Sequence, residues 1–249
     1  MVLSRMRNIS EKIIKPIANK AIKIGLTPNK ATLIGFLVSI LSASIIFLYP
    51  IWQYVLLLSA GLFFLAGCLD ALDGAIARNS HGVTAFGGFL DSVLDRYSDA
   101  ILIGCIIFVG FPNSQLCVPW IGLIALIGSL LVSYTRARAE SAGAKKMAVG
   151  IAERGERMII LMIVLILQGI PALALTANPL LVPVLAYTNI GLIILAVLTH
   201  ITVIQRIIHA YRVLPETDLA KNGEEITNSI SNEFFTTEEH LKEEIPSNV

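Results

Sequence analysis

The chain has 249 residues, of which 55% are hydrophobic and only 15% are charged, and its formal net charge is +1. A water-soluble domain of this length would carry far more charge, so the composition and the mean hydropathy of +0.74 indicate an integral membrane protein. The near-neutral charge gives no reason to expect a nucleic acid as partner.

The first segment in chain order is amphipathic. In RMRNISEKIIKPIANKAIKIG, residues 5–25, isoleucines and alanines alternate with lysines at near-helical spacing. This pattern favours a helix that lies at the membrane interface with its lysines near anionic headgroups; a solvated helix leading into the first span is the alternative. We assign residues 1–26 to this segment. Because its apolar residues are not gathered into one run, we expect no cleavable signal peptide.

Six apolar stretches long enough to cross a bilayer follow, at about residues 31–49, 52–78, 84–111, 116–137, 154–171 and 184–210. We therefore expect an all-α integral membrane domain of six transmembrane helices over residues 27–213. Lysines and arginines gather before the first stretch, in the second and fourth connections and after the last stretch, whereas the other three connections have none. By the positive-inside rule, this multi-pass protein has both termini in the cytoplasm.

The last segment, residues 214–249, is polar and acidic. It contains nine acidic residues against Lys221 and Lys242. Such a composition is typical of a disordered segment, so we expect a mostly disordered cytoplasmic tail without chemistry of its own.

An unusual group of carboxylates interrupts the second and third apolar stretches. Asp70 and Asp73 lie near the end of the second stretch, and Asp91 and Asp95 lie near the start of the third, with Asp99 one turn further along. At these spacings each pair shares one face of a helix. Two antiparallel helices joined by a short turn would bring the two faces together. The sequence therefore predicts four converging carboxylates at the cytoplasmic side.

Carboxylates at this density require a cation. One aspartate at the bilayer centre costs roughly 3 kcal/mol on insertion scales, and four would cost on the order of 10 kcal/mol. Oxygen ligands favour Mg²⁺, Mn²⁺ or Ca²⁺ over zinc, and neither the lone His81 nor the cysteines, Cys68, Cys105 and Cys117, have zinc-ligand spacing. We therefore expect one or two divalent ions that act on a phosphate; pairing with nearby arginines alone is the alternative.

Eight residues of this region form the pattern D-x2-D-G-x2-A-R-x8-G-x3-D-x3-D: Asp70, Asp73, Gly74, Ala77, Arg78, Gly87, Asp91 and Asp95. This pattern resembles the signature of the CDP-alcohol phosphatidyltransferases at all eight positions. The likeness covers about residues 25–212, and an interfacial helix followed by six spans is also typical of that family. It implies a homodimeric enzyme that transfers the phosphatidyl group of a CDP-lipid to the hydroxyl of a polar alcohol and releases CMP.

The resemblance also implies a role for each matched position. Asp70, Asp73 and Asp91 would hold two ions of Mg²⁺ or Mn²⁺, and Asp95, near or on them, would be the base that deprotonates the incoming hydroxyl. The donor, CDP-diacylglycerol or CDP-archaeol, would bind at Asn29, Thr32, Asp70, Asp73, Gly74, Ala77, Arg78, Thr84 and Gly87. For Asn29, capping of the first span is the alternative.

Arginine, rather than lysine, occurs at the predicted helix ends beside the aspartates. Arg136, Arg138, Arg154 and Arg206 all lie at predicted cytoplasmic helix ends. Lysine would serve equally well as a membrane anchor, whereas the guanidinium fork suits a phosphate. The sequence here also resembles the branch of the family whose acceptor is an inositol phosphate. We therefore expect 1L-myo-inositol 1-phosphate as the acceptor and these four arginines as ligands of its phosphate.

Two alternatives stay open at this point. Glycerol 3-phosphate also carries a phosphate that arginines would bind, so it is the second candidate acceptor. An ion-coupled transporter also holds aspartates in its membrane domain, but usually near the midplane on broken helices rather than beside a basic loop at the membrane surface. Metal-dependent release of CMP would separate the enzyme from the transporter.

Overall fold

The computed structural model describes residues 14–80, 83–111, 116–144, 147, 149–170 and 186–243, with side chains to residue 215 in the last helix. Its regular elements are α2 (Pro28–Ile45), the short 3₁₀ helix η1 (Ile46–Leu48), α3 (Val55–Asn79), α4 (Ala85–Gly110), α5 (Pro119–Ser141), α6 (Arg154–Gly169) and α8 (Tyr187–Glu243). Residues 14–23 are also helical. The expected all-α class is therefore confirmed for the described residues.

Six of these helices pack into a closed ring. In this ring α2 packs against α3 and α4, α5 packs against α4 and α8, and α6 packs against α8 and α3. Large apolar side chains fill the core, among them Phe63, Leu102, Ile106, Leu165 and Leu192. Because the ring closes between α6 and α3, segments that are far apart in the sequence meet at one end of the bundle.

Small polar side chains hold α2 against its two neighbours. The Ser42 hydroxyl donates to the Ser59 carbonyl at 2.7 Å, and the Ser59 hydroxyl donates to the Ser42 carbonyl at 2.9 Å. About one turn earlier on α2, the Ser39 hydroxyl donates to the Ser98 hydroxyl of α4 at 2.8 Å. Small residues and such bonds are typical of helix pairs in membranes, because they let two backbones approach closely. Both α3 and α4 are thereby fixed to α2.

Four helical segments among the described residues are long and apolar enough to cross a membrane: Pro28–Leu48, Val55–Asn79, Pro119–Ser141 and Tyr187–Pro215. They indicate a membrane protein, and large apolar side chains such as Leu37 and Phe64 are exposed on their outer faces. Two of the six predicted spans do not meet the same criterion. α4 carries a run of charged residues around Asp95, and α6 has only 16 residues.

The N-terminal helix packs on the same end of the bundle as the C-terminal part of α3. Ala18 and Ala21 are buried against Ala75 and Ile76, whereas Ile17 is 52% exposed. One face of this helix therefore contacts protein and another does not. Residues 1–13 of the predicted interfacial segment lie outside the described residues.

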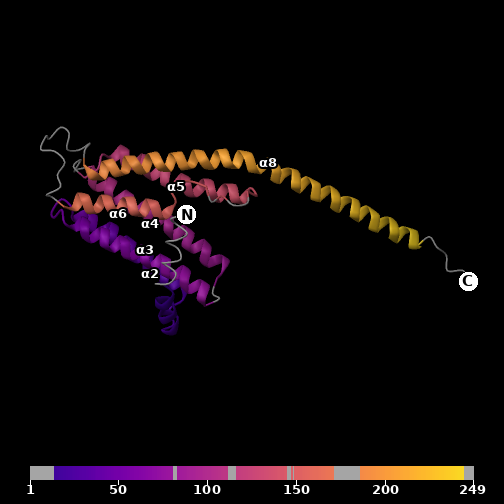
Figure 1. Cartoon of the computed structure of the whole chain (residues 1–249), viewed down its shortest axis with the longest axis horizontal. Coiled ribbons are helices and arrows are strands. Elements are labelled where there is room, and N and C mark those ends of the chain that lie inside the picture. The colour runs from indigo at the N-terminus through magenta and orange to yellow at the C-terminus, as the bar shows by residue number, and fades with distance from the viewer. Residues whose placement is uncertain are drawn as a thin grey trace, which may run out of the picture.

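α8 continues through Pro215 to Glu243, where the composition led us to expect a mostly disordered tail from residue 214. Figure 1 shows that this part of α8 extends away from the other helices. Glutamate, lysine and leucine are good helix formers, so an acidic composition does not itself prevent helix formation. Pro215 lacks a backbone donor and its ring crowds the carbonyl four residues earlier, so α8 is weakest at this position.

Candidate active site

The carboxylates come from two helix segments that point toward each other. Asp70 lies near the end of α3, and Asp91 and Asp95 lie near the start of α4. Thr84 sets that start, because its hydroxyl accepts a hydrogen bond from the Gly87 N–H at 3.0 Å and caps the helix. The spacing of four residues then places Asp91 and Asp95 on one face.

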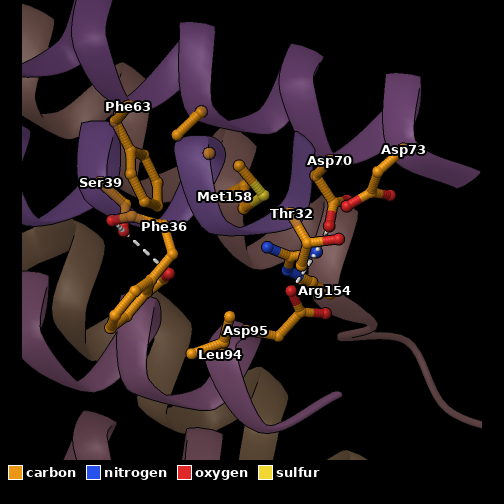
Figure 2. Close-up of a pocket in the computed structure, with 13 residues that line it drawn as sticks. Thr32, Phe36, Ser39, Phe63, Asp70, Asp73, Leu94, Asp95, Arg154 and Met158 are labelled. Carbon is orange, nitrogen blue, oxygen red and sulfur yellow. Dashed lines mark hydrogen bonds and ion pairs between the residues drawn. The ribbon is translucent and has the colours of Figure 1, made fainter. Parts of the chain in front are cut away.

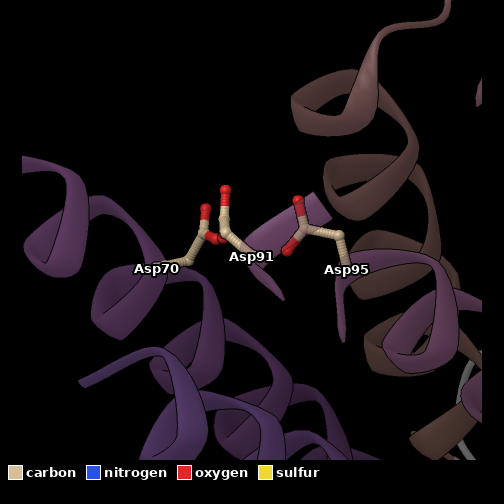
Figure 3. A group of neighbouring side chains, drawn as sticks. All are labelled: Asp70, Asp91 and Asp95. Carbon is tan, nitrogen blue, oxygen red and sulfur yellow. The ribbon is translucent and has the colours of Figure 1, made fainter. Parts of the chain in front are cut away.

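Three carboxylates converge, as Figure 3 shows. Asp70, Asp91 and Asp95 each offer an oxygen atom, and these atoms all lie within 4.8 Å of one another. Within the described residues, no other group of histidine, cysteine, aspartate or glutamate side chains is similarly arranged. His81, for which we expected no metal role, lies outside the described residues.

Asp73, the fourth predicted carboxylate, is set apart from this group. It is buried and lies next to Thr32 (Figure 2). Its Oδ2 atom has no hydrogen-bond partner, and the same is true of Asp91 Oδ1. Buried carboxylate oxygens without partners are costly unless a cation or a ligand donor pairs with them. The acidic cluster is therefore compatible with a divalent metal ion that prefers oxygen ligands, such as Mg²⁺ or Mn²⁺.

Arg154, the first residue of α6, reaches into the carboxylate group. Its Nη1 atom lies 2.7 Å from Asp95 Oδ1 and also pairs with Asp70 Oδ1. Figure 2 shows the guanidinium between these two carboxylates. Arg154 and Asp95 line both the small pocket of about 20 Å³ drawn there and a much larger cavity beside it. They therefore mark the boundary between the two spaces.

The larger cavity has a volume of about 610 Å³ and lies between α4, α5, α6 and α8. Its charged lining residues are Asp95, Arg96, Arg136, Glu140, Glu153, Arg154, Arg157 and Arg206. The excess of guanidinium groups makes this cavity suitable for an anion.

Three of the four predicted phosphate ligands line this cavity, namely Arg136, Arg154 and Arg206. Arg138 does not line it, and its Nη1 lies 3.4 Å from the Ser141 hydroxyl. Two residues along a helix correspond to more than half a turn, so Arg136 and Arg138 point in different directions.

Arg157 is a lining residue that we did not select from the sequence. Its spacing of three from Arg154 was the available signal, because residues so spaced share one side of a helix. It is only 4% exposed, and its Nη2 lies 2.8 Å from Asp99 Oδ2.

The residues expected to bind the nucleotide surround the start of α4 and the end of α3. A Cβ atom built on Gly87 would lie 3.0 Å from Asn29 Oδ1, so Asn29 reaches the first turn of α4. The Thr32 hydroxyl donates to the Pro28 carbonyl at 3.0 Å and lines the small pocket. Asn29 thus lies beside the first turn of α4, and Thr32 shares a pocket with Asp70, Asp73 and Asp95.

On α3, Gly74, Ala77 and Arg78 follow Asp73. Gly74 and Ala77 are half-buried, whereas Arg78 is exposed. A Cβ atom on Gly74 would meet only the Arg78 guanidinium, at 3.4 Å. This side of α3 is therefore open to a ligand that approaches the backbone.

The chain is similar to one group of known proteins along most of its length. Residues 25–203 match the family model described as CDP-alcohol phosphatidyltransferase. The archaetidylinositol phosphate synthase of Pyrococcus horikoshii is 38% identical over 84% of this chain and 96% of its own length. That of Methanothermobacter thermautotrophicus is 40% identical over 85% of this chain and 95% of its own length.

Solved structures agree with this similarity. The phosphatidylinositol phosphate synthase of Mycobacterium tuberculosis with CDP-DAG bound has a TM-score of 0.63 and 32% identity, covering 80% of this chain and 94% of that chain. The same enzyme in complex with manganese and citrate has a TM-score of 0.63 and 30% identity, covering 80% of this chain and 88% of that chain. The chain belongs to the CDP-alcohol phosphatidyltransferase family.

Proposed function

We propose that the protein transfers the phosphatidyl or archaetidyl group of a CDP-lipid to a hydroxyl of 1L-myo-inositol 1-phosphate and releases CMP. One observation carries this proposal: Asp95 belongs both to the carboxylate group and to the arginine-lined cavity of about 610 Å³. A reacting phosphate and a phosphorylated acceptor would therefore meet at one side chain. The relatives named after an inositol phosphate product support this acceptor.

The carboxylates have two roles in this proposal. Asp70, Asp73 and Asp91 hold one or two ions of Mg²⁺ or Mn²⁺. When bound, such an ion neutralises charge on the pyrophosphate and on the departing CMP. Asp95 faces the acceptor cavity and is the general base.

The transfer itself is a displacement at phosphorus. Asp95 takes the proton of the acceptor hydroxyl, and the hydroxyl oxygen forms a new bond to the phosphorus of the lipid phosphate. The bond from this phosphorus to the CMP oxygen breaks, and CMP leaves with the electron pair. Arg154 and Arg206 bind the acceptor's own phosphate and thereby orient the attacking hydroxyl.

The donor occupies the other side of the carboxylates. Its cytidine diphosphate binds near Asn29, Thr32, Thr84 and Gly87 at the start of α4, and beside Gly74, Ala77 and Arg78 on α3. For the lipid tails we propose an apolar groove of about 560 Å³ formed by the N-terminal helix, α3 and α6. Its lining includes Ile17, Phe64 and Met158, and it reaches Leu69, which precedes Asp70.

The membrane arrangement follows from the same bundle. α4 and α6 lie in one ring with the four candidate spans, so we propose that all six helices cross the membrane. The positive-inside rule then places both termini and the carboxylates at the cytoplasmic side. The N-terminal helix lies at that interface, and the functional unit is a homodimer.

Transfer of a labelled acceptor tests the proposed function. Purified protein in detergent is incubated with Mg²⁺ or Mn²⁺, a CDP-lipid and radiolabelled 1L-myo-inositol 1-phosphate or glycerol 3-phosphate. We expect labelled lipid and released CMP with the inositol compound. Labelled lipid from glycerol 3-phosphate alone would refute the inositol acceptor, and an absence of CMP release with both would refute the transferase.

Two arginines on α5 provide a matched test of the acceptor cavity. Arg136 lines it and Arg138 does not. Arg136→Ala removes one charged donor, so we expect the KM for the acceptor to rise about tenfold to hundredfold. Arg138→Ala is the control and should leave this KM unchanged. Equal effects of the two substitutions would show that the arginines act only through general surface charge.

A further inference from the structure

Residues 149–153, here called the strap, connect to the start of α6 and are hydrogen-bonded to α8. The Ile151 and Ala152 N–H groups both donate to the Thr202 hydroxyl, at 3.2 and 3.0 Å. The Val149 carbonyl accepts from Arg206 Nε at 2.8 Å. Two side chains of α8, one turn apart, thus hold the strap's backbone.

The strap is also held from the other side. Arg157 Nη1 donates to the Ala152 carbonyl at 3.3 Å, and Arg157 Nη2 donates to Asp99 Oδ2 at 2.8 Å. Ala152 and Thr202 are both fully buried, at 0% exposure. Ala152 therefore links two helices: its N–H contacts Thr202 of α8, and its carbonyl contacts Arg157, which pairs with Asp99 of α4.

Gly150 allows the strap to approach α8 this closely. Its φ of +137° lies in a region that L-residues rarely adopt. A Cβ atom at this position would also collide with the methyl carbon of Thr202. Glycine at position 150 therefore serves two purposes: it permits the positive φ, and it leaves room for the Thr202 side chain.

The position of Arg154 depends on this strap. Glu153, the N-cap of α6, makes no side-chain cap hydrogen bond, so the helix start is not fixed in the usual way. The hydrogen bonds of Ile151 and Ala152 fix it instead. Arg154 follows directly and reaches Asp95 and the arginine-lined cavity.

We propose that Thr202 is a positioning residue for recognition of the acceptor's phosphate. By accepting two backbone hydrogen bonds from the strap, it places Arg154 at the boundary between the carboxylates and the cavity. Thr202 does not itself line the cavity, so its effect is indirect. This role rests on the proposed function.

Three substitutions on α8 test the role in the full-length protein. Thr202→Val keeps the side-chain shape but removes the hydroxyl oxygen that accepts the two backbone hydrogen bonds. Thr202→Ser retains this hydroxyl. Thr199→Val is the matched control, because Thr199 is equally buried but its hydroxyl donates only to its own helix, at Leu195 and Ala196. For Thr202→Val we expect the KM for inositol phosphate to rise about tenfold, with the KM for the CDP-lipid unchanged. Thr202→Ser and Thr199→Val should both stay within about twofold of the wild type.

The wild type is first shown to transfer to inositol phosphate; failure there would refute the proposed function and this role with it. With an active wild type, an unchanged acceptor KM in folded Thr202→Val overturns the role alone. Equal changes in both KM values, or the same change in Thr199→Val, also overturn it. Gly150→Ala places a methyl group against the Thr202 side chain and should disturb the same contact. For this second variant we expect the same rise in the KM for inositol phosphate. If Thr202→Val does not fold, the acceptor KM of Gly150→Ala tests the positioning role instead.

Discussion

The two ends of the helix bundle use polar residues in opposite ways. At the end where α2 stops and α3 begins, polar side chains are uncharged and join different helices. The Gln53 amide donates to the Gln168 carbonyl at 2.7 Å, and Asn189 Oδ1 accepts from the Val118 N–H at 2.8 Å. At the other end, Asp73 and Asp91 keep buried carboxylate oxygens without partners.

The difference separates a structural use of polarity from a functional one. A satisfied polar group in an apolar bundle stabilises one helix arrangement. Converging carboxylates work against stability, and they are tolerated where a ligand compensates them. Substitutions of the converging carboxylates should therefore reduce activity more than stability, and substitutions of paired polar groups should do the reverse.

The largest effect is expected for Asp95→Asn. Loss of a general base typically costs a factor of about 10² to 10⁴ in rate, so CMP release should fall by that amount. The thermal unfolding temperature in detergent should change little, because Arg154 keeps its pairing with Asp70 and the substitution removes like-charge repulsion. An active Asp95→Asn protein, or one that is inactive because it is unfolded, would contradict a functional rather than structural role for this carboxylate.

Substitution of Asp99, one turn after Asp95, should have the opposite effect and mainly reduce stability. It is 4% exposed and ion-paired with Arg157. Asp99→Asn leaves a buried guanidinium without its counter-charge, which typically costs about 3–5 kcal/mol of stability. Thermal or denaturant unfolding in detergent measures this loss.

A double variant sharpens the result for Asp99. Replacing both partners with apolar residues, as in Asp99→Leu with Arg157→Met, removes the unpaired charge and should recover part of the lost stability. A double variant that is less stable than Asp99→Asn would contradict a purely pairwise explanation.

The smallest effect is expected for Gln53→Leu at the opposite end. It removes one neutral hydrogen bond between the residues that precede α3 and the end of α6, so the stability should fall by about 1 kcal/mol. Both KM values should equal those of the wild type, as measured in the labelled-acceptor assay. A change in either KM would show that the two ends are coupled.

Much of the carboxylate site could be predicted from the sequence, because it depends on local spacing. Asp91 and Asp95 share a face of α4 through helical periodicity alone, and a short turn brings α3 and α4 into antiparallel order. The separate position of Asp73 could not be predicted in this way. Asp73 lies beside Thr32 of α2, and this neighbour follows from the packing of α2 against α3.

The arginine cavity shows where such prediction fails. Composition placed arginines at the correct helix ends but did not distinguish Arg136 from Arg138, because the direction of a side chain depends on which neighbours its helix faces. The sequence likewise gave no reason to expect a hydrogen bond from residues 151 and 152 to Thr202, some 50 positions away.

The sequence by itself determined the apolar helices, the family signature and the facing carboxylates, since these follow from composition and from periodicity within one or two helices. Only the tertiary structure decided that α6 closes the ring beside α3 and brings Arg154 to Asp70 and Asp95. Contacts between distant segments arise from the packing of whole helices, and no local pattern records which helices become neighbours.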